Sequence, residues 1–216
     1  MGHDENPYAA PSALGGGSTE AALAASFQHD SYVIRRKVFK LFGGAFHIYD
    51  AAMEHVLFYA EQKAFKLKED FLVYADEGKT TPLLRIRARS VIDFGATYDI
   101  TDAKSGQILG SARRKGFASM VRDSWELYGP RDELLASAQE DSLALAMVRR
   151  LLSNLVPQTF DVKGPDEALL ARFAQHFNPF VFRMTLDYSS DVNHELDRRL
   201  GIGLAVCMTA IEGRQS

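Results

Sequence analysis

Three arginines alternate with apolar residues in the stretch Leu83 to Arg89 (LLRIRAR). In an extended strand the side chains of Arg85, Arg87 and Arg89 point to one face, about 7 Å apart. Guanidinium groups bind phosphate through forked hydrogen bonds, so this row is a candidate site for phosphate or a lipid headgroup. The competing interpretation is a solvated strand face, with the arginines paired to acids on neighbouring strands. Antiparallel sheets commonly have one wet face, which weighs toward this second interpretation.

A second run of ligand-type residues lies near the C-terminus, at Asp187 to Arg198 (DYSSDVNHELDR). Oxygen-bearing side chains recur there at every second residue from Asp187 to Asn193, the alternation that a calcium loop uses. A calcium loop also requires glycine at its sixth position and glutamate at its twelfth, where this chain has Val192 and Arg198. We therefore expect a polar turn followed by a helix cap, with no bound metal.

Motifs of known enzyme classes are missing from the sequence. The chain has no HExxH metal motif, no paired cysteines, no GxSxG elbow and no GxxxxGK[ST] phosphate loop. Its single cysteine, Cys207, lies in an apolar segment, where we expect a small buried hydrophobe rather than a nucleophile. Histidines are scattered at His29, His47, His55, His176 and His194. We expect no catalytic site and no cofactor, although a spatial triad leaves little trace in a sequence.

The charge balance argues against a general attraction to nucleic acid. The chain carries 25 basic and 28 acidic residues, for a net charge of −3. No overall basic field draws nucleic acid or an anionic membrane to such a molecule, so any binding of phosphate or lipid must be local. Lys66 with Lys68, and the run Arg113 to Lys115, are further local groups of basic residues.

The segment Leu200 to Ile211 (LGIGLAVCMTAI) is apolar on every side, so protein or lipid must enclose it. At about 1.5 Å per residue it spans roughly 18 Å, which is short for the ~30 Å hydrocarbon layer of a bilayer. We expect a helix over about 193–212 within a protein core, and no transmembrane segment. Small residues at Gly201 and Gly203 let surrounding walls approach this helix closely.

Most of the chain shows the period-two pattern of β-strands. Turn signals separate short runs of apolar, aromatic and β-branched residues. The expected strands are 32–40, 45–50, 55–62, 64–68, 71–75, 83–89, 96–101, 107–113, 124–128, 133–138, 159–163, 169–175 and 179–187. Residues 142–155 instead show a helical period. About twelve strands can close into a barrel wide enough for a helix, whereas an eight-stranded barrel is filled by its own side chains. We infer a mainly β fold, a closed barrel of about twelve strands around the apolar C-terminal helix.

Composition divides the chain into two parts. Residues 1–28 are rich in alanine, glycine, serine and proline, with a GGGS run at Gly15 to Ser18, and we expect a flexible tail. Residues 29–216 are expected to form a single barrel domain. The N-terminus lacks the basic and apolar regions of a secretory signal, and one cysteine allows no intrachain disulfide, so we expect a cytoplasmic protein.

Four stretches follow one another in a recognisable order: YVIRRKVFKLFGGAFHIYD, FKLKEDFLVYADE, DITDAKSGQILGSARRK and WELYG. With the apolar final helix, this series resembles the LURP-one-related proteins of the tubby C-terminal-like and phospholipid-scramblase-like group. The resemblance runs from about Ser31 to Arg214. The turn from Asp102 to Gly106 reads D-A-K-S-G, one residue longer than the D-x-x-G turn of the family, so the match is one of pattern rather than identity.

The resemblance implies a twelve-stranded barrel around a central C-terminal helix, the tubby C-terminal-like fold. Members of the group include phosphoinositide-binding modules, proposed lipid scramblases and many bacterial proteins without an established role, and fold does not settle function. We expect a non-catalytic module that binds an anionic lipid or other phosphate-bearing ligand through Arg85, Arg87 and Arg89, peripherally at a membrane surface. The alternatives are a structural or protein-interaction domain with a protein partner and, third, a phospholipid scramblase.

Overall fold

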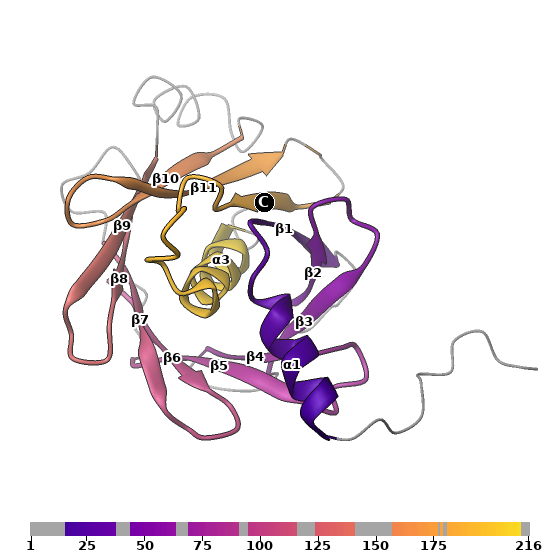
Figure 1. Cartoon of the computed structure of the whole chain (residues 1–216). Coiled ribbons are helices and arrows are strands. Elements are labelled where there is room, and N and C mark those ends of the chain that lie inside the picture. Colours follow the sequence, from indigo (N-terminus) through magenta and orange to yellow (C-terminus); the bar gives the residue numbers. More distant parts are fainter. Residues whose placement is uncertain are drawn as a thin grey trace, which may run out of the picture.

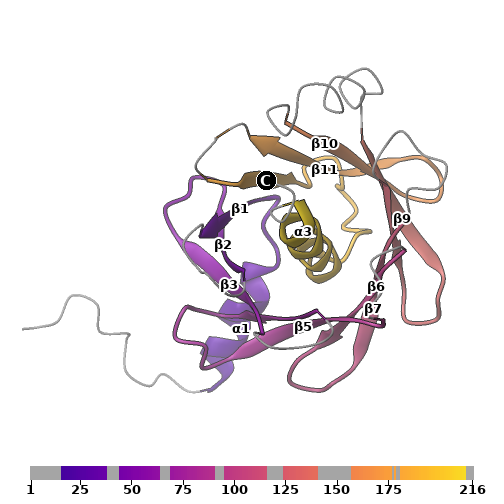
Figure 2. The ribbon, with the colours of Figure 1, turned by 180° about the vertical axis from the view of Figure 1, so that it is seen from behind.

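Twelve antiparallel strands close into a barrel around the C-terminal helix (Figures 1 and 2), as the sequence predicts. The computed structural model describes residues 16–37, 44–63, 69–90, 95–115, 124–140, 157–176, 178 and 181–212. The strands are β1 (Ser31–Lys37), β2 (Ala45–Asp50), β3 (Val56–Gln62), β4 (Asp70–Tyr74), β5 (Pro82–Ala88), β6 (Thr97–Asp102), β7 (Ile108–Arg114), β8 (Ser124–Tyr128), β9 (Leu134–Glu140), β10 (Thr159–Lys163), β11 (Leu169–His176) and β12 (Arg183–Asp187). Each strand pairs with its neighbours in sequence, and β1 pairs with β12 to close the barrel.

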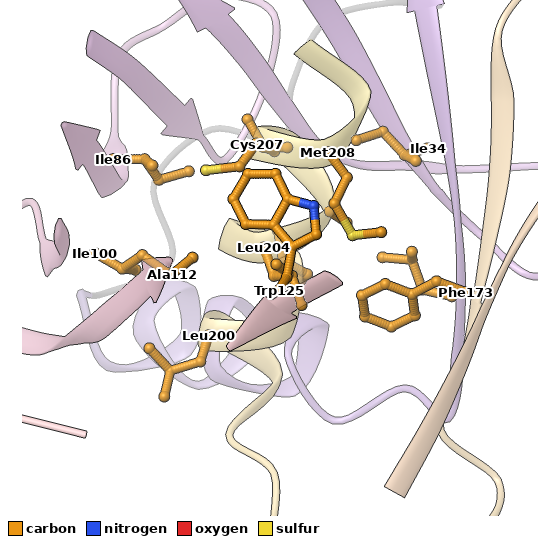
Figure 3. Close-up of a cluster of buried hydrophobic side chains, with 14 of the residues drawn as sticks. Ile34, Ile86, Ile100, Ala112, Trp125, Phe173, Leu200, Leu204, Cys207 and Met208 are labelled. Carbon is orange, nitrogen blue, oxygen red and sulfur yellow. The ribbon is translucent and has the colours of Figure 1, made fainter. Parts of the chain in front are cut away.

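Helix α3 (Arg198–Glu212) runs through the lumen of the barrel. All residues from Leu200 to Ala210 are buried, as an all-round apolar helix requires. Figure 3 shows Leu204, Cys207 and Met208 of α3 together with Trp125 and Phe173 from the wall. The helix begins at Arg198 rather than near residue 193, because residues 188–197 form an irregular loop that leads into the lumen. Among the described helices, none combines the length and apolarity needed to cross a bilayer.

Close packing of α3 against the wall and against the loop that precedes the helix explains two glycines in the helix. A Cβ atom at Gly203 would lie 2.7 Å from Cδ1 of Ile100, and one at Gly201 would overlap the hydroxyl of Tyr188. Both neighbours are fully buried and have little room to move. The small residues that the sequence places at these positions therefore bring the helix against the wall.

Five hairpins lie at the end of the barrel where α3 enters, and each has a β-bulge just after its turn. In every case the register skips one residue near the start of the second strand. The skipped residues are all leucines: Leu57, Leu83, Leu109, Leu135 and Leu170. These side chains are buried in the core or packed against it. The repeated bulge thus bends each hairpin so that a leucine closes the end of the barrel.

The loop before α3 is held by an ion pair between Asp191 and Arg198. Nη1 of Arg198 lies 2.6 Å from Oδ2 of Asp191, and both side chains are nearly inaccessible to solvent. The Asp191 carboxylate also accepts hydrogen bonds from the backbone N–H groups of Glu195 and Leu196, at 2.8 and 3.1 Å. The Arg198 guanidinium in turn lies over the ring of Tyr188, 4.4 Å from its centroid.

Two of the side chains in the calcium-loop alternation, Asp187 and Asp191, accept hydrogen bonds within this segment. Asp187 accepts a hydrogen bond from the N–H of Ser189, and Asp197 accepts one from the N–H of Arg199 at the start of α3. The segment is therefore a polar turn and helix cap, as expected from its sequence. Within the described ranges, no cluster of three histidine, cysteine or acidic side chains is placed to hold a metal ion.

Part of the segment that composition assigns to a flexible tail is helical. Helix α1 (Gly16–Ser26) precedes β1 and lies beside the barrel near β3 and β4 in Figure 1. The ring of Phe27 stacks on Phe58 with centroids 4.5 Å apart, and the hydroxyl of Tyr32 donates to the carbonyl of Ser26. Residues 16–26 of the segment expected to be a tail thus form a helix, and contacts at its C-terminal end join it to the barrel.

Some sequence predictions fall outside the described residues. They are the strand at 64–68, the helix at 142–155 and the start of the tail at 1–15.

Candidate functional site

Arg85 and Arg87 of β5 and Arg89, which follows the strand, point outward from the barrel, as their alternation predicts. Their neighbours Leu84, Ile86 and Ala88 are buried in the core, whereas the arginine side chains are half-buried or exposed. The structure therefore brings all three guanidinium groups to one outer face. Their surroundings decide what they can bind.

Two of the three arginines are paired with acids on the neighbouring strands. Arg85 donates from Nε and Nη2 to the two oxygens of Asp70 in β4, at 3.0 and 2.7 Å. Arg89, just after β5, donates from Nε to Asp99 of β6, at 2.8 Å. The Asp70 carboxyl is only 3% exposed. Burial alone would raise the pKa of Asp70, but the hydrogen bonds from Arg85 together with the positive charges of Arg85, Lys63 and Arg87 outweigh that effect and hold the pKa below its usual value. Both pairs match the competing interpretation of the row, the paired strand face.

Arg87 differs from its two neighbours. It lies directly opposite Asp70 on one side and Asp99 on the other, but both carboxylates turn diagonally toward Arg85 and Arg89. Arg87 is exposed and makes no hydrogen bond or ion pair with another described residue. Its guanidinium therefore projects from the wall between two fixed ion pairs, with its donors turned to solvent.

Lysine adds positive charge to this part of the wall. The ammonium of Lys63, which follows β3, contributes to the lowered pKa of Asp70 and so lies within electrostatic range of it. The outer face of β4 to β6 carries Arg85, Arg87 and Arg89 against Asp70 and Asp99, and Lys63 beside β4 adds a further positive charge. This surface, which we call the Arg87 face, is locally positive although the whole chain is negative.

The other basic groups noted in the sequence are less available. Arg113 lies 4.5 Å from the centroid of the Tyr128 ring, and Lys115 forms an ion pair with Glu126. Arg114 points inward and is 8% exposed. Lys66 and Lys68 lie outside the described residues.

One pair of neighbouring basic residues could not be recognised in the sequence. Arg35 of β1 and Arg183 of β12 are direct partners in the strand pair that closes the barrel. No local pattern could reveal them, because the two residues lie near opposite ends of the chain. Only the closure of the barrel brings them together.

The described histidines do not form a catalytic group with Cys207. His47 contacts Glu77, His55 lies 2.8 Å from Asp50, and His176 lies 2.7 Å from Thr185. Burial raises the pKa of the Cys207 thiol, which disfavours the reactive thiolate. These side chains therefore have separate local partners.

Comparison with known families gives a match over most of the chain. Residues 56–209, most of the barrel and nearly all of α3, match the family model described as LURP-one-related. A search of curated proteins finds no match to this chain.

Proposed function

This chain belongs to the LURP-one-related family, and we propose that its barrel is a non-catalytic module that binds a phosphate-bearing anionic ligand on the Arg87 face. The observation that carries the proposal is the position of Arg87, exposed between two ion pairs that fix its neighbours. We further propose a cytoplasmic location, with the barrel peripheral to a membrane surface when the ligand is a lipid headgroup.

The flanking ion pairs favour binding because they preorganise the site. Arg85 is held by two parallel hydrogen bonds from Nε and Nη2, which leaves Nη1 outside that pair. A phosphate beside Arg87 would meet one fully available guanidinium and further positive charge from Arg85 and Arg89. Because Arg85 and Arg89 are already ordered, only Arg87 loses substantial side-chain entropy on binding, so less of the interaction free energy is spent on ordering.

The surroundings of each arginine determine which substitution tests binding without also changing stability. Replacing Arg85 would leave the Asp70 carboxylate buried without its partner and would change stability together with binding. Arg87→Ala removes a guanidinium without leaving a buried charge. Arg131→Ala is the matched control, because Arg131 is an exposed arginine in the turn between β8 and β9, away from the Arg87 face.

We expect Arg87→Ala to weaken binding to vesicles that contain anionic phospholipid by about fivefold, from about 1 kcal/mol per basic residue near such a surface. The measurement is sedimentation with vesicles of graded anionic content at low and physiological salt, and binding should decrease as salt rises. Competition with inorganic phosphate distinguishes a phosphate site from one that needs a bilayer. Equal binding by wild type, Arg87→Ala and Arg131→Ala, or no binding at low salt, would refute the proposal.

A second candidate function is a protein-interaction domain, and one surface favours it. Four large aliphatic side chains are exposed among the described residues, and all lie at the end of the barrel where α3 enters: Val56, Ile108, Leu134 and Val192. The hairpin turns at the same end, with the ends of β2 and β6 beside them, carry many acids: Asp50, Glu54, Asp76, Glu77, Asp102, Asp132, Glu133, Asp166 and Glu167. The combination suits a partner segment with basic and aliphatic side chains.

For this second function we expect the double variant Ile108→Ser, Leu134→Ser to lose protein partners that wild type retains. The measurement is quantitative mass spectrometry of proteins bound to each immobilised variant. Leu72→Ser, on the outer wall of β4, is the control that removes a partly exposed aliphatic side chain elsewhere. An identical set of partners on the double variant and on wild type would exclude this end of the barrel as the interface. A scramblase function has no comparable support, since α3 lies inside the barrel.

A further inference from the structure

Two arginines meet on the outer wall where the barrel closes. Arg35 in β1 and Arg183 in β12 occupy directly paired positions. The residues beside them, Ile34 and Met184, are fully buried in the core, so both arginines point away from it. Both are exposed. Side chains at directly paired antiparallel positions have Cβ atoms about 4.5–5.5 Å apart.

The pairing of Arg35 with Arg183 is electrostatically unfavourable, and the described contacts of the two residues do not offset the repulsion. Like charges directly opposite each other destabilise a strand pair. Arg35 makes no hydrogen bond or ion pair within the described part of the chain. Nη1 of Arg183 lies 3.9 Å from the sulfur of Met53, which carries no charge. By contrast, Arg85, Arg89 and Arg172 on other strands each have an acid partner.

On the flanking strands, the residues opposite Arg35 and Arg183 are histidines rather than acids. His176 of β11 lies opposite Arg183, and its Nε2 lies 2.7 Å from the hydroxyl oxygen of Thr185. Burial and the charge of Arg183 together lower the pKa of His176. On the other side His47 of β2 lies opposite Arg35 and contacts the carboxylate of Glu77. Glu77 therefore has a partner other than the two arginines.

We propose that Arg35 and Arg183 form an anion site that binds the dianionic phosphate group of a monoester or of inorganic phosphate. Two guanidinium groups at neighbouring strand positions can each donate forked hydrogen bonds to one phosphate. Two positive charges match a phosphate dianion, whereas a carboxylate brings only one negative charge. A bound phosphate would also remove the repulsion between the arginines, so binding and strand closure would support each other.

This site is separate from the Arg87 face. Strands β2, β3 and β4 lie between β1 and β5 on one side, and β6 to β11 lie between β5 and β12 on the other. The two surfaces therefore face in different directions around the barrel. The phosphate site neither requires the proposed function nor falls with it.

The test is thermal unfolding in inorganic phosphate, compared with chloride at the same ionic strength. We expect phosphate to raise the Tm of wild type by a few degrees at concentrations well above Kd. Without phosphate, Arg35→Gln and Arg183→Gln should each leave the Tm unchanged or raise it, because each removes the repulsion. When both substitutions are made separately on an Arg87→Ala background, so that phosphate bound at the Arg87 face does not contribute, the rise caused by phosphate should be lost.

Controls separate this site from other effects. Arg172→Gln removes an arginine that pairs with Asp161 on the neighbouring β10, and it should keep the rise in phosphate. Arg87→Ala should keep it as well. Repeating the comparison with phosphatidic acid vesicles distinguishes a lipid headgroup from free phosphate. The proposal is overturned by equal Tm values in phosphate and chloride, by a rise that persists in both glutamine variants on the Arg87→Ala background, or by a rise that only Arg87→Ala abolishes.

Discussion

We expect Leu204→Asp to abolish folding of the barrel. Leu204 is fully buried in the middle of α3 and belongs to the core cluster that includes Trp125. Loss of its packing costs about 2–5 kcal/mol, the usual range for Leu→Ala in a core. An unpaired carboxylate in the same place adds several kcal/mol or is neutralised at a cost. Together these approach the whole stability of a domain, about 5–15 kcal/mol.

The measurement is soluble yield and the circular dichroism melt of Leu204→Asp beside two other variants. Leu204→Ala should fold with a Tm several degrees lower, because it lacks the buried charge. Val192→Asp should resemble wild type, since Val192 is 81% exposed in the loop before α3. A Leu204→Asp protein that folds with the stability of wild type would mean that α3 does not occupy the lumen.

Asp191→Ala is expected to lower the free energy of unfolding by about 3–5 kcal/mol, the range for breaking a buried ion pair. The substitution leaves the guanidinium of Arg198, which is 4% exposed, without its carboxylate. It also removes the acceptor for two backbone N–H groups in the loop that leads into the lumen. Denaturant unfolding measures the loss. Asp161→Ala, which breaks the more exposed pair with Arg172, is the control and should cost at most about 1 kcal/mol.

The same pair predicts a dependence of stability on pH. Burial disfavours ionisation of Asp191, but hydrogen bonds from Arg198 and two backbone N–H groups prevail and hold its pKa below the ordinary value of 3.8. A group with a lowered pKa in the folded state stabilises the fold above its unfolded pKa and loses that contribution as pH falls through the folded pKa. The stability difference between wild type and Asp191→Ala should therefore be full at neutral pH and shrink below about pH 4. A difference that stays constant down to pH 2 would show that the carboxylate charge is not what holds the loop.

Much of the architecture could be predicted because it depends on local periodicity. The alternation in β5 separates Leu84 and Ile86 from the arginines, and the apolar α3 requires an enclosure. A closed barrel is the arrangement that satisfies both. Helix α3 begins later than the sequence predicts. Polar residues such as Asn193 and Glu195 are compatible with a first helical turn, whereas the Asp191 carboxylate accepts hydrogen bonds from the backbone N–H groups of Glu195 and Leu196 and so stabilises a loop there.

The candidate site was less accessible to sequence reasoning because binding depends on which charges are already paired. The alternation of arginines predicts a common face, but only strand register reveals that Asp70 and Asp99 engage Arg85 and Arg89 and leave Arg87. Arg35 and Arg183 are separated by almost the whole barrel in sequence and meet through its closure. Such long-range pairing leaves no local pattern.

The most direct test of the proposed binding function is residue-resolved mapping of where the ligand binds. Backbone amide chemical shifts would be followed by NMR while a soluble headgroup such as glycerol phosphate is added. The account predicts saturable shifts at Arg87 and its neighbours in β4 to β6, and their loss in Arg87→Ala. Absence of shifts on the Arg87 face at saturating ligand, or shifts there that survive Arg87→Ala unchanged, would contradict it.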